Sequence, residues 1–232
     1  MRRLLLIASL FAATYLSAQP TIGIHGNVIG ASMTNKTDDP EEDFGDFDTR
    51  ISWKLGLVTE IPLSEQFVFA PQLNLLSKGG KINMNGEIDL GTGPVPFELD
   101  GNAKLTYLEL PLNFIYKTPG GFFIGAGPSI SYGLGGELEG DATVTYMGQT
   151  DSESFSNDIV FDGEKAENVD DDDVHFKAFE FGATILAGYQ LPNGIQINAH
   201  YNHGFSNIDP NSGSESKNKY FGLGVTYFFK RK

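Results

Sequence analysis

The chain has 232 residues, with 30 acidic and 16 basic side chains, a formal net charge of −14 and no cysteine. This acidity argues against nucleic-acid binding, which needs clustered lysine and arginine next to the phosphates. The lack of cysteine excludes disulfides and a lipid-modified N-terminal cysteine. The acids are concentrated in three segments, because 24 of the 30 lie in residues 38–48, 87–100 and 137–173.

The first 19 residues have the three parts of a secretory signal peptide. Arg2 and Arg3 form a basic region, 4–13 is an apolar run, and Ser17–Gln19 offers small residues for cleavage. The apolar run is shorter than the roughly 20 residues that a membrane-spanning helix needs. We therefore expect export of the chain, with residues 20–232 forming one all-β domain.

Outside the acidic segments, apolar and polar residues alternate with the period of a β-strand. In the last such stretch the side chains from Phe221 to Phe229 alternate between bulky apolar residues on one face and Gly222, Gly224 and Thr226 on the other. Each stretch is long enough for a tilted strand that crosses a membrane, which needs about 9–11 residues. The pattern predicts eight strands, at 21–32, 50–61, 66–78, 103–117, 121–133, 175–190, 194–206 and 218–229.

The connections between these strands alternate in length. Three are short turns built from Pro, Gly and Asn-Gly, at 61–65, 118–121 and 191–194. The other four are long loops, at 33–49, 79–102, 134–174 and 207–217. This alternation puts both termini on the short-turn side, which is periplasmic in bacterial outer-membrane barrels, while long loops are extracellular.

Two features predict that the apolar faces point outward into lipid. The polar faces are rich in small residues, which suits the narrow lumen of an eight-stranded barrel. Bulky aromatic residues, typical of the two membrane interfaces, lie near strand ends at Trp53, Phe67, Tyr116, Phe122, Tyr132, Tyr189 and Phe229. We therefore predict an eight-stranded antiparallel up-and-down transmembrane β-barrel in the bacterial outer membrane. The alternative is a soluble periplasmic lipid-binding barrel, with the apolar faces turned inward.

Four segments resemble recurring segments of the PorT-like outer-membrane β-barrel family. They are Val58–Ser64 (VTEIPLS), Ala70–Leu73 (APQL), Tyr107–Leu112 (YLELPL) and Tyr201–Ile208 (YNHGFSNI). They occur in the family's order and span nearly all of the mature chain. The resemblance implies an eight-stranded barrel inserted by the barrel-assembly machinery, without a uniform activity.

The histidines are the first place to look for catalysis. His25 and His200 fall on lumen-facing positions, and His203 with Ser206 and Glu180 is the nearest combination to a Ser/His site. No serine is clearly convergent with both a histidine and an acid. We therefore predict no catalytic residue and no enzymatic activity, with the histidines filling the lumen. The alternative is an outer-membrane lipid-modifying enzyme.

No metal or cofactor site is predicted either. The run Asp170–Asp173 offers the oxygen ligands that Ca²⁺ and Mg²⁺ prefer, but it lacks the spacing of an EF-hand loop and fits a solvated loop. The glycine clusters are not followed by the Gly-Lys-Ser/Thr of a phosphate loop. Weak divalent-ion bridging to anionic lipopolysaccharide is the alternative for the acidic run.

Together these patterns predict a non-enzymatic outer-membrane barrel that anchors acidic surface loops for interaction, envelope integrity or accessory work in secretion. The expected partners are outer-membrane lipid and lipopolysaccharide, the barrel-assembly machinery, and an unknown extracellular or secretion-system partner. Inside the lumen, Lys54, Glu109, Glu180 and His200 share the inward phase. Because isolated charges would be costly there, we expect Lys54 to pair with one of the two glutamates.

Overall fold

The computed structural model describes residues 19–37, 47–89, 93–146, 148–165 and 173–229. The signal peptide expected at 1–19 lies almost wholly outside these residues, as do three aspartates of the run 170–173. No helix in the described part of the chain is long and apolar enough to cross a membrane.

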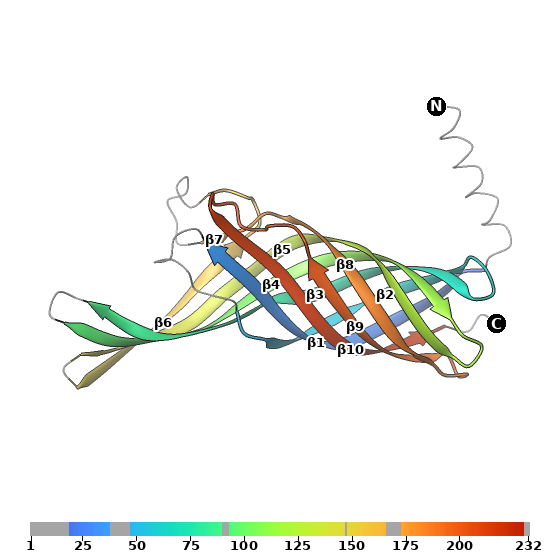
Figure 1. The fold of residues 1–232 in the computed structure, drawn as a ribbon, viewed down its shortest axis with the longest axis horizontal. Helices are drawn as coiled ribbons and strands as arrows, with labels where there is room; N and C mark the ends of the chain where they lie inside the picture. The colour runs from blue at the N-terminus through green and yellow to red at the C-terminus, as the bar shows by residue number, and fades with distance from the viewer. Residues whose placement is uncertain (1–18, 38–46, 90–92, 147, 166–172, 230–232) are drawn as a thin grey trace, which may run out of the picture.

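The described residues contain ten strands (Figure 1). They are β1 (Thr21–Thr37), β2 (Arg50–Pro62), β3 (Phe67–Asp89), β4 (Pro94–Lys117), β5 (Phe122–Tyr146), β6 (Gln149–Val160), β7 (Val174–His175), β8 (Phe179–Gln190), β9 (Ile195–Gly204) and β10 (Ser214–Phe228).

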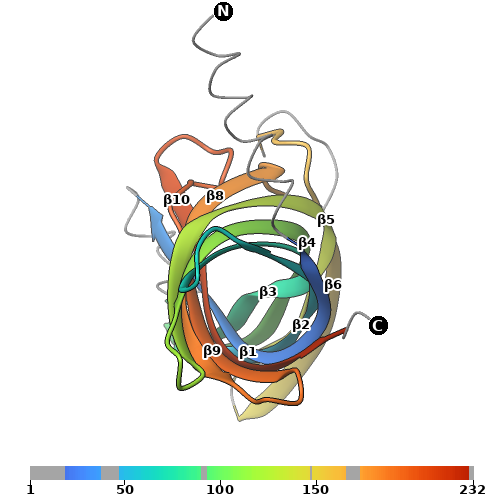
Figure 2. The same ribbon diagram turned by 90° about the vertical axis from the view of Figure 1, so that its right-hand side faces the viewer.

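Eight of these strands close into a ring, which Figure 2 shows end-on. Neighbours follow the order β4-β3-β2-β1-β10-β9-β8-β5, and the pairing of β4 with β5 completes the circle. Every pairing within the ring is antiparallel. This confirms the predicted eight-stranded antiparallel barrel. β6 and β7 lie outside the ring, with β6 paired to β5 and β7 paired to β6.

Burial alternates along the ring strands and assigns their faces. In β10, Tyr220 points inward with 1% of its surface exposed, while Leu223 points outward with 68% exposed. The same pattern repeats around the ring, so the outer wall is a band of exposed aliphatic and aromatic side chains. Near the short turns the aromatic residues pair on the outer face, with ring centroids 5.3 Å apart for Phe67–Tyr116 and 4.8 Å apart for Phe122–Tyr189. The apolar faces therefore point outward, as predicted, and not inward as in a soluble barrel.

The inside of the ring holds two apolar clusters separated by polar residues. We call the ends of the barrel the short-turn end and the long-connection end. The cluster toward the short-turn end consists of Val58, Val68, Ala70, Ile115, Phe123, Leu186 and Phe228. The cluster toward the long-connection end includes Ile29, Met33, Leu76, Leu105, Tyr107, Ile208 and Tyr220. Between them lie buried amide, imidazole and charged side chains, which form the site described below.

Two of the predicted long loops are largely strand, which corrects the sequence-based boundaries. Most of 79–102 is a hairpin, in which β3 continues to Asp89 and β4 begins at Pro94. Much of 134–174 is also a hairpin, made by the end of β5 and by β6. Acidic residues are typical of solvated loops, but in these hairpins they lie on alternating strands, most of them on one face and Asp151 and Glu153 on the other. The predicted strand at 175–190 begins instead at Phe179, because Val174 and His175 pair with β6.

These extensions join into one four-stranded sheet that projects beyond the ring at the long-connection end, at the left of Figure 1. We call this sheet the arm and define it as residues 79–89, 94–104, 137–146 and 149–158. The ladder is unbroken across its base, since Gly79 pairs with Lys104, Lys104 with Glu137, and Glu137 with Asp158.

The outward-facing wall gives a first prediction. Leu223→Arg places a guanidinium on the outer face halfway along the barrel, where a basic residue facing lipid costs about 2–4 kcal/mol. Leu63→Arg changes a residue of similar exposure in the turn between β2 and β3, where the cost is about 0–1 kcal/mol. Denaturant unfolding from lipid vesicles measures both free energies. Equal losses for the two variants would contradict the assignment of the lipid-facing wall.

Candidate functional site

The buried charges of the lumen centre on Lys78, which β3 directs inward. Its amine lies 2.7 Å from Glu180 Oε1 and 3.5 Å from Glu109 Oε2, and all three side chains are at most 1% exposed. It also donates to Ser131 Oγ at 2.9 Å. One lysine from β3 therefore joins carboxylates from β4 and β8 across the barrel interior.

Neutral donors bind one oxygen of each carboxylate, and Glu109 Oε2 is left with the Lys78 ion pair alone. Tyr220 donates its hydroxyl to Glu109 Oε1 at 2.7 Å, and Asn218 donates its amide to Glu180 Oε2 at 2.7 Å. Both donors come from β10. Since buried charges are tolerated when they are paired and hydrogen-bonded, this arrangement accounts for ionised groups in so narrow an interior.

Lys54 is inward and buried as predicted, but it is not the centre of the network. Its amine lies 3.4 Å from the Tyr220 hydroxyl and 5.1 Å from the centroid of that ring. No ion pair joins Lys54 to Glu109 or Glu180 among the residues that the structure describes. The expectation of a Lys54–glutamate pair is therefore wrong, and Lys78 takes that place. The sequence analysis missed Lys78 because it is the last residue of the predicted third strand, at the edge of the predicted loop. The alternation nevertheless includes it, since Asn74, Leu76 and Lys78 all point inward.

Among the described residues, His25, His200 and His203 are not brought together with a serine and an acid. His25 is inward, with Nε2 2.9 Å from Asn74 Oδ1. His200 is also buried and packs edge-on to Tyr220, with centroids 5.7 Å apart. His203 instead contacts the Tyr201 hydroxyl at 3.3 Å on the outer wall.

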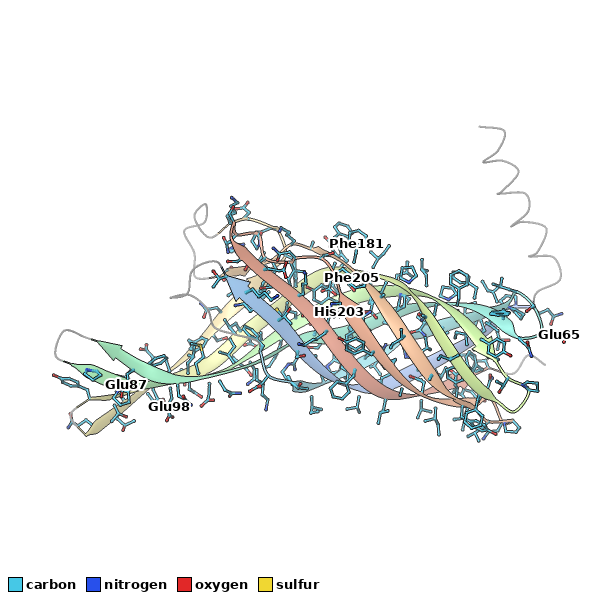
Figure 3. All side chains as sticks on the ribbon, viewed as in Figure 1. Glu65, Glu87, Glu98, Phe181, His203 and Phe205 are labelled. Atoms are coloured by element: carbon cyan, nitrogen blue, oxygen red, sulfur yellow. The ribbon has the colours of Figure 1, made fainter. Side chains whose placement is uncertain are left out.

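The combination of His203, Ser206 and Glu180 does not form. Glu180 points into the lumen, while His203 lies beside Phe205 (Figure 3), with ring centroids 5.4 Å apart. Ser206 Oγ accepts the Phe181 N–H at 2.8 Å. Within the described residues no group of three His, Asp or Glu could hold a metal ion. The prediction that the chain has no catalytic, cofactor or metal residue stays a prediction.

A short lid covers the long-connection end of the lumen. We define the lid as residues 161–165 and 173–178. Phe161 packs edge-on to Tyr107 with centroids 5.1 Å apart, and Phe176 belongs to the apolar cluster below it. The Lys177 N–H donates to the Ile208 carbonyl at 2.7 Å, which ties the lid to the chain before β10.

A polar pair holds the two parts of the lid to each other. Asp162 accepts the Glu164 N–H at 2.9 Å and lies 3.0 Å from His175 Nδ1. The Glu164 N–H, followed by the His175 side chain, lowers the pKa of the exposed Asp162 carboxyl below its ordinary value. This carboxylate therefore stays ionised at neutral pH, available to the imidazole.

The short-turn end is closed by a second charge pair. Lys117 donates to Glu60 Oε2 at 2.6 Å and to Gln190 Oε1 at 2.7 Å, next to the apolar cluster at that end. Between the closed ends, the polar layer around His25, Asn113 and His200 leaves a cavity of about 20 Å³, which is close to the space one water molecule needs. The lumen is therefore a packed core and not a pore.

The arm has two chemically different faces. In the row at its middle, Asn83, Asp100, Asp141 and Ser154 lie side by side on one face. In the next row toward the tip, Met84, Leu99 and Ala142 lie on the other face, which continues the inward face of the barrel. The arm carries ten acids and two lysines. Eight of the acids lie on the polar face, which is turned away from the lumen side, and Asp151 and Glu153 lie on the face of Met84 and Leu99.

The ring, its apolar outer wall and its filled lumen define an integral β-barrel membrane protein. The family model described as "Outer membrane protein beta-barrel domain" matches residues 14–209, and the chain belongs to this family. Its location is therefore the bacterial outer membrane, as predicted. The match does not separate the PorT-like group from the rest of the family.

Solved structures of other outer-membrane proteins match nearly the whole chain. Ail of Yersinia pestis is 14% identical over 91% of this chain and 99% of its own, with a TM-score of 0.36. Neisserial surface protein A is 10% identical over 91% and 99%, with a TM-score of 0.39. At these identities the likeness concerns the fold alone. No curated protein matches the chain.

The prediction that the protein is not an enzyme needs correction. The outer membrane protease OmpT of Escherichia coli is among the matching structures, at 12% identity over 92% of this chain and 97% of its own, with a TM-score of 0.32. The lack of a visible Ser/His site is the basis of that prediction, and OmpT shows that an outer-membrane barrel can be an enzyme.

The lumen network gives a second prediction. Lys78→Met leaves Glu109 and Glu180 facing each other without the cation, and breaking a buried pair in this way costs about 3–5 kcal/mol. Lys54→Met removes an amine that contacts only Tyr220 in the described network, so the loss in the free energy of unfolding should be smaller. Lys78→Met combined with Glu180→Gln should recover part of the loss. A larger loss for Lys54→Met, measured by denaturant unfolding in lipid, would contradict Lys78 as the centre.

Proposed function

We propose that the protein is a closed outer-membrane anchor that displays the acidic arm at the cell surface for interaction with other molecules. In this orientation the long-connection end is extracellular, and the short turns and both chain termini are periplasmic. The observation that carries the proposal is the continuity of the arm with the barrel wall. β3, β4 and β5 each run as one strand from the ring into the arm, and the β4–β5 pairing continues through a single register shift at Thr106/Tyr107.

Continuity matters because it gives the acids fixed positions. A solvated loop would spread its charges over many conformations, whereas neighbouring strands in a ladder hold side chains about 5 Å apart. Glu98, Asp100 and Asp141 are exposed on this ladder. The arm therefore suits recognition of a partner by a defined pattern of charge.

The filled lumen supports display over transport. The Lys78 network, the two apolar clusters and the Lys117–Glu60 pair occupy the interior from end to end. Water-filled channels occur in barrels of roughly 16 strands, whereas eight-stranded barrels are filled by side chains.

The proposed partners follow from the surfaces of the molecule. The apolar wall would contact outer-membrane lipid, and its outer rim would contact lipopolysaccharide. The resemblance of four segments to PorT-like proteins supports insertion by the barrel-assembly machinery, as for other members. The partner of the arm would be an extracellular or secretion-system molecule. Display of the arm would then contribute to envelope integrity or to accessory work in secretion.

Accessibility of inserted tags tests the orientation. An epitope inserted after Gly148, in the exposed turn between β5 and β6, should be labelled by antibody on intact cells. An epitope between Pro119 and Gly120, in the short turn between β4 and β5, should be labelled only after the outer membrane is opened. The reason is that these turns lie at opposite ends of the barrel. Equal labelling of both tags on intact cells would contradict the proposal.

A further inference from the structure

The outer strand of the arm has an open edge. β6 pairs with β5 from Gln149 to Ile159. On its other side it pairs with β7 at Ile159 and Val160 alone. From Gln149 to Ser156 that side pairs with no strand in the described parts of the chain. Such an edge presents unpaired N–H and C=O groups, which are a template for another strand.

β6 lacks most features that block an edge from pairing. It contains no proline and no lysine, and its register against β5 runs without a shift over the whole hairpin. What it does carry is negative charge, at Asp151, Glu153 and Asp158. If two copies paired through their β6 edges, these carboxylates would lie against one another, and like charges on adjacent strands are destabilising. The edge therefore disfavours a second copy of this chain.

The charge around the edge is not neutralised from within the arm. The β5–β6 hairpin from Glu137 to Asp158 has six acids and neither lysine nor arginine. Lys104 on β4 pairs with Glu139 at 2.5 Å and with Glu137 at 3.6 Å. For the four remaining acids, no ion pair is found among the residues described: Asp141, Asp151, Glu153 and Asp158. Three of them, Asp151, Glu153 and Asp158, lie on β6 itself, beside the edge that an incoming strand would meet.

The carboxylates lie on both faces beside the edge. Asp151 and Glu153 share the face of Met84 and Leu99 through the registers of the three pairings. On the opposite face a hollow of about 460 Å³ reaches β6 at Ser154, and its lining includes Asp100, Glu139 and Asp141. A strand beside β6 would thus have Asp151 and Glu153 next to its side chains on one face and Asp158 on the other, with Asp141 and Asp100 one and two strands farther away.

We propose that the β6 edge binds an extended basic segment of a partner protein by strand addition. The backbone of the segment would pair with β6, and lysine or arginine at every second position would face Asp151 and Glu153. This inference rests on the proposed display function, because it names the partner class of the arm.

The opposite edge of the arm is less suited to this role. Lys81 of β3 already forms an isolated bridge with Asp48, and Asn83 donates its amide to Asp48 Oδ2 at 2.8 Å. The β3 edge is therefore partly covered and carries a lysine, which would repel a basic segment. It provides the matched control surface.

Peptide titration against the full-length barrel in lipid nanodiscs tests the proposal. The probe is a fluorescent eleven-residue peptide in which lysine alternates with valine or threonine, and anisotropy measures its binding. Replacing the three central spacer residues of the peptide by proline keeps its charge but removes backbone donors, so binding should weaken about 10-fold or more. A version with glutamate in place of lysine should not bind.

Variants of the protein locate the edge. Asp151→Asn with Glu153→Gln should weaken binding of the lysine peptide about 10-fold, because both charge contacts are lost. Glu87→Gln, which removes an acid from β3 at the other edge, should leave it within about twofold. Because the chain has no cysteine, Ser152→Cys can be cross-linked to a single cysteine in the peptide, with Asn85→Cys on β3 as control. Ser152→Cys should cross-link, and Asn85→Cys should not.

Several outcomes would overturn the inference. Equal affinity for the proline peptide would mean that charge alone attracts the probe, without strand addition. Cross-linking at Asn85→Cys as efficient as at Ser152→Cys would move the site off β6, and a Ser152→Cys dimer without peptide would make a second copy the occupant. Loss of tag labelling on intact cells would instead overturn display, while peptide binding to the purified barrel would be unaffected.

Discussion

The structure depends on one constraint: inside a bilayer, each backbone N–H and C=O must find its partner within the protein. The ring meets it by pairing β4 with β5 and so leaving no open edge at membrane depth. With only eight strands the closed ring is narrow. Small residues on its inner face follow from that, as at Gly224, where an added Cβ would collide with the side chain of Asn27.

A narrow, closed interior also governs the charges within it. Lys78, Glu109 and Glu180 cannot reach bulk water, so each must be compensated by the others or by the hydroxyl and amide groups of β10. Replacing such a cluster by apolar residues is often neutral in stability. The polar layer between the two apolar clusters therefore adds little net stability. Its role is to determine which strands face one another across the lumen.

Much of this fold could be predicted from the sequence, because alternation along a strand reports directly on two faces with different surroundings. The strand number, the outward apolar wall and the inward positions of Lys54, Glu109 and Glu180 follow from it. The ends of the strands were harder to predict from the sequence. Acidic residues in 79–102 and 134–174 resemble those of a solvated loop, yet Met84 and Leu99 continue the alternation into the arm. Which groups pair across the lumen depends on register, and register is set by contacts between residues distant in the chain.

The β1–β10 pairing has a consequence for how the barrel assembles. Three of the strand pairings in the ring are hairpins closed by the short turns. The β1–β10 pairing instead joins the two ends of the chain, in register from Gly23↔Phe228 to Thr37↔Ser214. Closing a loop of this length costs more conformational entropy than closing a turn, and such distant contacts form slowly. The pairing of β1 with β10 should therefore be the last strand pairing to form during insertion. Until this pairing forms, β1 and β10 are open strand edges with unpaired backbone N–H and C=O groups, which a factor outside the chain has to shield from lipid.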